Sequence, residues 1–194
     1  MEKILDRKSY AYVILFMKID THRIFRAINA EALVEMNQQF DFYDGGGLDM
    51  SFLGAAQISP EGDVNVSRLC EGKLIGPGGF IDISQSTRNI SFLSTFTAKG
   101  LKLLCDGEQG SIKIENEGST RKFVNEVYEC TFSGNEAVRR GQKVYYVTER
   151  AVFRRTAAHS KIELVEIAPG IDLQRDVLDQ MVNIVDGATI CLSF

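Results

Sequence analysis

Apolar residues in this sequence fall into short segments that are separated by glycine-rich and polar loops. Leu48, Met50 and Phe52 alternate with polar residues, and this spacing predicts a strand, because successive side chains of a strand point to opposite faces. The same reasoning predicts further strands within residues 40–43, 64–66, 90–97, 101–105, 111–115, 123–132, 144–147, 151–153 and 162–167. The segments at 101–105 and 111–115 flank a polar loop, so they are expected to form a hairpin.

Two helices are predicted before residue 90. Residues 29–38 place apolar side chains at helical spacing, and Asn29 is a possible N-cap. Residues 81–87 follow a glycine run and are expected to form a short helix. Each of these segments comes before a predicted strand, as it would in a fold where helices and strands alternate.

Capping residues predict two more helices in the second half of the chain. Ser133-Gly-Asn-Glu136 has the spacing of a capping box, and Gly141 can end the helix that it begins. Asp172 is expected to cap a C-terminal helix. The apolar face of that helix would consist of Leu173, Val177, Leu178 and Met181. Together these elements predict an α/β or mixed-sheet domain with β-hairpin additions.

The composition is typical of one globular domain and narrows the classes of partner. The chain has 194 residues, of which 44% are hydrophobic and 25% are charged. Its net charge of −4, without a long basic stretch, argues against a nucleic-acid groove. No apolar run approaches the roughly 18–20 residues that a membrane span needs. We therefore expect neither a nucleic-acid nor a membrane partner.

Cysteines and histidines are spread without the spacing of metal ligands. They are Cys70, Cys105, Cys130, Cys191, His22 and His159. No metal site is predicted from them, and scattered thiols suit a reducing cytoplasm. His159 stands between two predicted strands and is expected at a hairpin tip rather than as a general base.

Two glycine runs are the candidate ligand loops, Gly45–Gly47 and Gly76–Gly79. Because glycine lacks a Cβ atom, such runs can bring backbone N–H groups against a ligand, and a helix that starts after the second run would favour an anion or an oxyanion. Glycine clusters also serve simply as turns. Neither run has the spacing of a phosphate-binding P-loop or of the dinucleotide fingerprint, so ATP and NAD are not predicted as ligands.

Four charged positions have both a structural and a functional interpretation. Asp49 and Asp82, which follow the glycine runs, are expected to fix loop geometry by accepting backbone N–H bonds, with direct chemistry as the alternative. Glu149 and Arg150 are expected to form a structural ion pair, although an arginine beside a ligand carboxylate would give the same pattern. The residues alone show no nucleophile paired with a base.

Five ordered motifs within residues 29–182 carry more information than their spacing. They are Phe40-Asp-Phe-Tyr-Asp-Gly-Gly-Gly-Leu-Asp49, Gly78-Gly-Phe-Ile-Asp82 with Ser84-Gln85, Thr95-Phe-Thr-Ala98, Tyr146-Val-Thr-Glu-Arg-Ala-Val-Phe153 and Glu166-Ile-Ala-Pro-Gly-Ile-Asp-Leu173. Together they resemble the C-terminal part of a family I coenzyme A transferase of the acetate/propionate or 3-ketoacid type. The resemblance implies a mixed, largely parallel sheet of that type and an activity that moves CoA between an acyl-CoA and a free short-chain carboxylate, as in short-chain fatty acid and ketone body metabolism.

The resemblance also implies a site. The family uses a glutamate that attacks the thioester, forms a mixed anhydride and becomes a glutamyl-CoA thioester, so its tetrahedral species need N–H donors. By resemblance, Gly76, Gly78 and Gly79 would lie at the acyl-CoA thioester. The same pocket would be lined by Gly45, Gly46 and Gly47. Coenzyme A would be a substrate, and no permanently bound cofactor is implied.

The sequence departs from the family in its first 28 residues. They contain no Glu-Ser-Gly or Glu-Asn-Gly motif, so we assign no catalytic nucleophile. We expect residues 1–28 to be an unmatched leader and residues 29–194 to be a truncated CoA-transferase-like domain that is inactive alone. It would act as a homo-oligomer or with a complementing N-terminal half. The alternative is a non-catalytic CoA-binding or subunit-interaction module.

Overall fold

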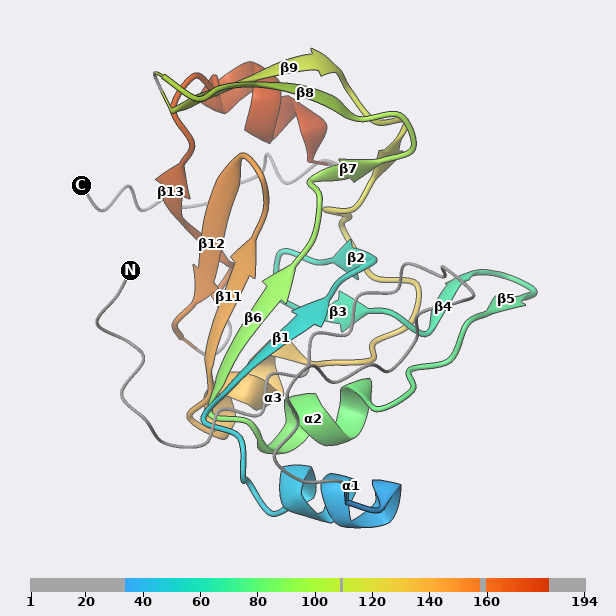
Figure 1. Cartoon of the computed structure of the whole chain (residues 1–194). Helices are drawn as coiled ribbons and strands as arrows, with labels where there is room; N and C mark the ends of the chain where they lie inside the picture. The colour runs from blue at the N-terminus through green and yellow to red at the C-terminus, as the bar shows by residue number, and fades with distance from the viewer. Residues whose placement is uncertain (1–33, 109, 158–159, 182–194) are drawn as a thin grey trace.

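The computed structural model describes residues 34–108, 110–157 and 160–181, and its centre is a five-stranded sheet (Figure 1). The strands in spatial order are β1 (Met50–Gly54), β6 (Asn89–Leu93), β11 (Lys143–Val147), β12 (Ala151–Arg155) and β13 (Glu163–Ile167). The first three are parallel, and β12 and β13 continue the sheet antiparallel. The prediction of a mixed α/β fold is confirmed, with two of the four strand pairings parallel.

Three short helices, α1 (Met36–Asp44), α2 (Phe80–Ser86) and α3 (Gly134–Arg139), gather on one side of the molecule (Figure 1). The core forms where α2 meets the sheet, because the Phe80 ring stacks on the Phe92 ring of β6 with 5.8 Å between centroids. The ring of Phe132, just before α3, meets Phe92 edge-on at 4.9 Å. Leu53, Ile90, Val144 and Tyr146 of the three parallel strands are buried with them. This set of side chains forms one buried face of the sheet, and in β1 that face carries Leu53 rather than the Met50 and Phe52 of the predicted alternation.

Four two-stranded ribbons and a C-terminal helical segment surround the sheet. The ribbons are β2 (Gln57–Ile58) with β3 (Val64–Asn65), β4 (Arg68–Cys70) with β5 (Lys73–Leu74), β7 (Thr97–Ala98) with β10 (Thr120–Arg121), and β8 (Lys102–Asp106) with β9 (Ser111–Asn116). The helical segment is a π-helical turn, Leu173–Val177, followed by a 3₁₀ turn, Leu178–Gln180. The predicted β8–β9 hairpin is confirmed, and the β4–β5 hairpin projects from the body (Figure 1).

Two caps behave as predicted. The Ser133 hydroxyl accepts the Glu136 N–H at 3.4 Å at the start of α3, and Gly141 follows this helix with φ 73°. The Asp172 carboxylate accepts the Arg175 N–H at 2.8 Å, although the segment that it caps is π-helical and 3₁₀ rather than α-helical. Sequence spacing thus predicted where both helical segments begin, but not that the second is π-helical and 3₁₀.

Two predicted strands are wrong. Residues 40–43 are helical, because Phe40 and Tyr43 stand three residues apart on one face of α1 with their rings edge-on at 5.5 Å. Residues 123–132 cross the body as an irregular segment, and among the described residues their backbone forms only isolated bridges with strands, Ile58 to Phe123 and Val64 to Phe132. Their apolar residues enter the core singly and do not form one face of a strand.

Some predictions fall outside the described residues, namely those on Asn29, His22, His159, Cys191 and residues 1–28. Within the described part, the helix predicted for residues 29–38 begins at Met36, and its N-cap residue Glu35 makes no side-chain cap. No helix in this part is both long and apolar enough to cross a membrane.

Candidate functional site

The second glycine run forms an open loop that leads into α2. Gly76 and Gly78 have φ angles of 84° and 55°, which side chains other than glycine rarely adopt, and a Cβ atom on either would have nothing within 4 Å. Gly79 is the N-cap residue of α2, and a Cβ there would come within 2.7 Å of the Phe40 ring. Among the described residues, the N–H groups of Gly78 and Gly79 donate to no acceptor. The loop therefore offers two donors that no described residue uses, with open space at the Cβ positions of Gly76 and Gly78.

The first glycine run closes the end of α1 instead. The N–H groups of Gly45, Gly46 and Gly47 donate to the carbonyl groups of Asp41, Tyr43 and Phe42, respectively. Gly46 has φ 76°, and a Cβ on Gly47 would collide with the Phe42 ring. These glycines satisfy the free carbonyl groups at the helix end, so their N–H groups are already used.

The structure places the two runs at opposite ends of α2. Gly79 begins this helix, whereas the Cβ position of Gly46 lies 3.9 Å from the carbonyl oxygen of Ser86, the last residue of the helix. The strand β1 starts after Gly47 and the strand β6 starts after α2, so the first run lies where the parallel strands begin. In open α/β sheets, ligands bind at the other edge, beyond the carboxyl ends of the strands. Ligand binding by Gly45–Gly47 stays a prediction.

The two aspartates do not hold the loops as expected. Neither the Asp49 nor the Asp82 carboxylate accepts a hydrogen bond from a described residue. Asp49 instead offers its backbone carbonyl, which accepts from the Asn89 side-chain amide at 2.7 Å. The glycine loops are shaped by backbone bonds and ring contacts, so the prediction of Asx-type turns is wrong here.

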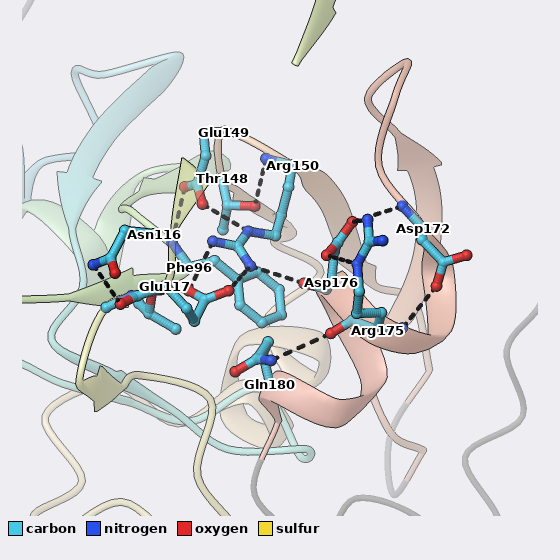
Figure 2. Close-up of polar contacts among 12 residues, drawn as sticks. Phe96, Asn116, Glu117, Thr148, Glu149, Arg150, Asp172, Arg175, Asp176 and Gln180 are labelled. Atoms are coloured by element: carbon cyan, nitrogen blue, oxygen red, sulfur yellow. Dashed lines mark hydrogen bonds and ion pairs between the residues drawn. The ribbon is translucent and has the colours of Figure 1, made fainter. Parts of the chain in front are cut away.

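A buried arginine organises the carboxyl ends of β6 and β11. Arg150 is 0% exposed, and its guanidinium lies between the carboxylates of Glu149 and Glu117, with an N–O distance of 2.8 Å to each (Figure 2). It also donates to the Asp176 carbonyl at 2.8 Å and lies 4.8 Å from the centre of the Phe96 ring. The predicted Glu149–Arg150 ion pair is confirmed as part of a larger network.

This network ties four segments of the chain together, those of Phe96, Glu117, Arg150 and Asp176. The second Glu149 oxygen accepts the Phe96 N–H at 2.9 Å, which fixes the chain where it leaves β6. Burial alone would raise the pKa of Glu117, but bonds from Arg150 and Thr97 hold it below the ordinary 4.5. Burial alone would lower the pKa of Arg150, but its two carboxylate partners raise it. Glu117 and Arg150 therefore stay charged at neutral pH, as a rigid support rather than as acid–base catalysts.

Sequence reasoning missed two charged residues at this edge. Glu117 lies 33 positions from Arg150 in a polar stretch, and nothing local marks it as a partner. Lys122 donates to the Ala55 carbonyl at 3.4 Å where the chain leaves β1. Burial lowers the pKa of Lys122, and the nearby Glu149 carboxylate opposes this change. Neither contact can be predicted from local spacing, because the two partners of each are far apart in the sequence.

A small hollow lies between α2 and α3. Its lining includes Ser84, Arg140 and Gln142, and none of the six predicted glycines lines it. The Gln142 amide donates to the Ser84 and Thr87 carbonyl groups at 2.9 and 2.6 Å and so caps the end of α2. At about 110 Å³ the hollow is smaller than the roughly 300–1,000 Å³ of ordinary ligand pockets. It is too small to hold an acyl-CoA.

Comparison with known proteins identifies relatives for most of the chain. No protein-family model matches it. Acetate CoA-transferase YdiF of Escherichia coli strain K12 is 47% identical over 154 residues, which are 79% of this chain and 28% of that protein. Caffeate CoA-transferase of Acetobacterium woodii is 46% identical over 159 residues, 79% of this chain and 29% of that protein. The chain thus spans less than a third of the length of these curated relatives.

Solved structures agree in fold. The apoenzyme of the acyl-CoA transferase YdiF from E. coli O157:H7 matches with a TM-score of 0.74 and 46% identity, over 80% of this chain and 29% of that one. Its thioester complex with CoA matches with a TM-score of 0.75, over 81% of this chain and 30% of that one. Glutaconate coenzyme A-transferase of Acidaminococcus fermentans, at 18% identity and a TM-score of 0.51 over 75% of this chain and 53% of that one, shares the fold.

Proposed function

We propose that this chain, whose matched part belongs to the family I coenzyme A transferases, supplies one wall of an acyl-CoA pocket, with the Gly76–Gly79 loop against the thioester. The observation that carries this proposal is a pair of N–H groups, on Gly78 and Gly79, that donate to no described residue, with open space at the Cβ position of Gly78. Such donors stabilise the oxyanion that forms when a thioester carbonyl is attacked. The buried Arg150 network would keep the neighbouring strand ends rigid during this step.

The nucleophile is proposed to come from outside the described residues of this chain. Glu149 and Glu117 are both ion-paired to Arg150, and each uses its oxygens as hydrogen-bond acceptors within the network. We therefore propose that the chain binds CoA but does not turn over alone, and that a complementing chain provides the attacking carboxylate. The acceptor would be a short-chain carboxylic acid, with CoA as a substrate and not as a resident cofactor.

The first prediction tests this division of roles. The purified chain is expected to bind CoA in isothermal titration calorimetry and to show no exchange of labelled CoA between acetyl-CoA and acetate. Adding the remainder of the YdiF sequence, without the segment homologous to this chain, is expected to start that exchange. Steady exchange by the chain alone would contradict the missing nucleophile. Binding without exchange in the mixture would favour the alternative, a non-catalytic CoA-binding module.

The free edge of the sheet supports the proposal of a complementing partner or of a homo-oligomer. Among the described residues, β1 pairs only with β6, so its other edge is open. Phe52, Ser91 and Tyr145 are register partners across β1, β6 and β11, on the face opposite the core. Met50 and Tyr145 on this face are 42% and 38% exposed. Parallel strands are normally covered on both faces, so this surface is suited to a further protein layer.

The second prediction concerns this surface. Changing both Met50 and Tyr145 to lysine is expected to reduce self-association, or association with the YdiF remainder, by about tenfold or more, because charges would enter an apolar contact. Light scattering after size-exclusion chromatography measures it. Leu104→Lys is the control, since Leu104 is 51% exposed on the separate β8–β9 hairpin. Equal loss in both variants, or a strictly monomeric wild type that ignores the YdiF remainder, would contradict the proposed interface.

The compartment proposed for this chain is the cytoplasm. Cys70, Cys105 and Cys130 are free and exposed in the described part of the chain. Exposed unpaired thiols persist in reducing compartments, which supports this location.

A further inference from the structure

A buried asparagine shapes the turn that comes before the β4–β5 hairpin. Asn65 is fully buried at the end of β3, and its side-chain oxygen accepts the N–H groups of Ser67 and Arg68 at 3.0 and 3.3 Å. Its side-chain nitrogen donates to the Arg68 carbonyl at 2.6 Å and to the Gln57 side chain at 2.7 Å. Every polar atom of this amide has a partner, so the turn at residues 65–68 has one well-defined geometry.

A threonine from a distant segment holds the same turn. The Thr131 hydroxyl oxygen accepts the Val66 N–H at 3.2 Å and lies 2.8 Å from the Ser67 hydroxyl. Thr131 stands 64 positions after Ser67, in the segment that leads to α3. Two side chains from different parts of the fold therefore fix residues 66–68.

The turn at residues 65–68 in turn positions the start of the Gly76–Gly79 loop. The Ser67 carbonyl accepts the N–H groups of both Ile75 and Gly76, at 2.8 and 3.1 Å. Between these points, β4 and β5 pair only with each other among the described residues, and the hairpin projects from the body (Figure 1). The position of Gly76 thus depends on where the Ser67 carbonyl points, while Gly79 at the other end packs against Phe40.

From these contacts we infer that Asn65 and Thr131 are positioning residues for the Gly76–Gly79 loop and act through the Ser67 carbonyl. The inference rests on the proposed binding of CoA at this loop. The two residues do not touch the ligand. They fix the position and orientation of this loop, because its N–H groups must lie within hydrogen-bond distance of a ligand carbonyl oxygen.

The third prediction tests the hydroxyl of Thr131 with a nearly isosteric change. Thr131→Val removes the acceptor for Val66 and is expected to weaken CoA binding about tenfold and to speed hydrogen exchange of the Gly76 amide by a similar factor. Thr131→Ser keeps the hydroxyl and is expected to restore both values. Thr87→Val is the matched control, because Thr87 is fully buried and its hydroxyl donates to the Ile83 carbonyl at 2.5 Å at the far end of α2.

The outcomes separate this inference from the proposed function. If Thr87→Val lowers the melting temperature as much as Thr131→Val yet leaves CoA binding and Gly76 exchange unchanged, positioning is supported. Equal effects of both variants on CoA binding and on Gly76 exchange would overturn it, and so would unchanged Gly76 exchange in Thr131→Val. If the wild type binds no CoA, the proposed function fails, while the exchange of the Gly76 amide still decides whether Thr131 holds the loop.

Discussion

Replacing Arg150 with methionine is expected to lower the free energy of unfolding by about 3 kcal/mol, as measured by urea denaturation. The guanidinium is fully buried and pairs with Glu117 and Glu149, whose side chains are mostly buried. Methionine would fill much of the space above the Phe96 ring but would leave both carboxylates without their cation. The value lies near the low end for a broken buried pair, because Glu117 keeps some contact with solvent.

The matched control is an arginine that also pairs with glutamate but does so on the surface. Arg139 pairs with Glu136 at 2.7 Å and is largely exposed, so Arg139→Met is expected to change stability very little. An equal loss of stability in both variants would contradict the importance of burial. Glu117→Gln in the Arg150→Met background is expected to recover part of the loss, because it removes one of the two uncompensated charges.

The pH dependence of the same variant supplies a second measurement. The folded pKa of Glu117 is held below 4.5, so the stabilisation from its pair with Arg150 is complete above that value and is lost as the pH falls through the lower folded pKa. The stability difference between the wild type and Arg150→Met is therefore expected to be largest near neutral pH and to shrink below about 4.5. A difference that does not change with pH would show that lost packing, and not charge, causes the effect.

Local patterns predicted those parts of the fold that local forces determine. The Ser133 cap of α3 and the hairpin β8–β9 need only neighbouring residues, and both formed as expected, although the Glu136 carboxylate of the predicted capping box pairs with Arg139 and Arg140 instead. Residues 40–43 failed because two aromatics three positions apart fit a helix face as well as a strand edge. Residues 123–132 failed because their apolar side chains are placed by the body of the protein rather than by a strand partner.

The candidate site shows the same limit. Both glycine runs have a similar sequence outline, yet one uses its N–H groups to close α1 and the other leaves two of them without an acceptor among the described residues. The difference arises from what precedes each run. The first run follows the end of a helix, whereas the second follows a hairpin whose last residues donate hydrogen bonds to the Ser67 carbonyl. Glu117 and Thr131 act across long sequence separations, so no local spacing could reveal them.

Replacing Gly78 with leucine is expected to weaken CoA binding by at least about 100-fold, which corresponds to roughly 2.7 kcal/mol. Gly78 has φ 55° and open space at its Cβ position, and the proposed thioester would occupy that space. A leucine side chain would fill it, and the strained backbone would also turn the neighbouring N–H groups away from the ligand. Calorimetric titration with CoA measures the effect.

Gly72 provides a closely matched control for this last prediction. It lies in the turn of the β4–β5 hairpin with φ 74°, and its Cβ position also has nothing within 4 Å. Gly72→Leu therefore introduces similar backbone strain, of about 1–2 kcal/mol, and the same side chain a few residues away. If strain alone mattered, both variants would bind CoA equally poorly. If the Gly76–Gly79 loop meets the thioester, only Gly78→Leu loses binding while the two variants unfold at similar urea concentrations. Retained binding in Gly78→Leu would remove the loop from the proposed pocket.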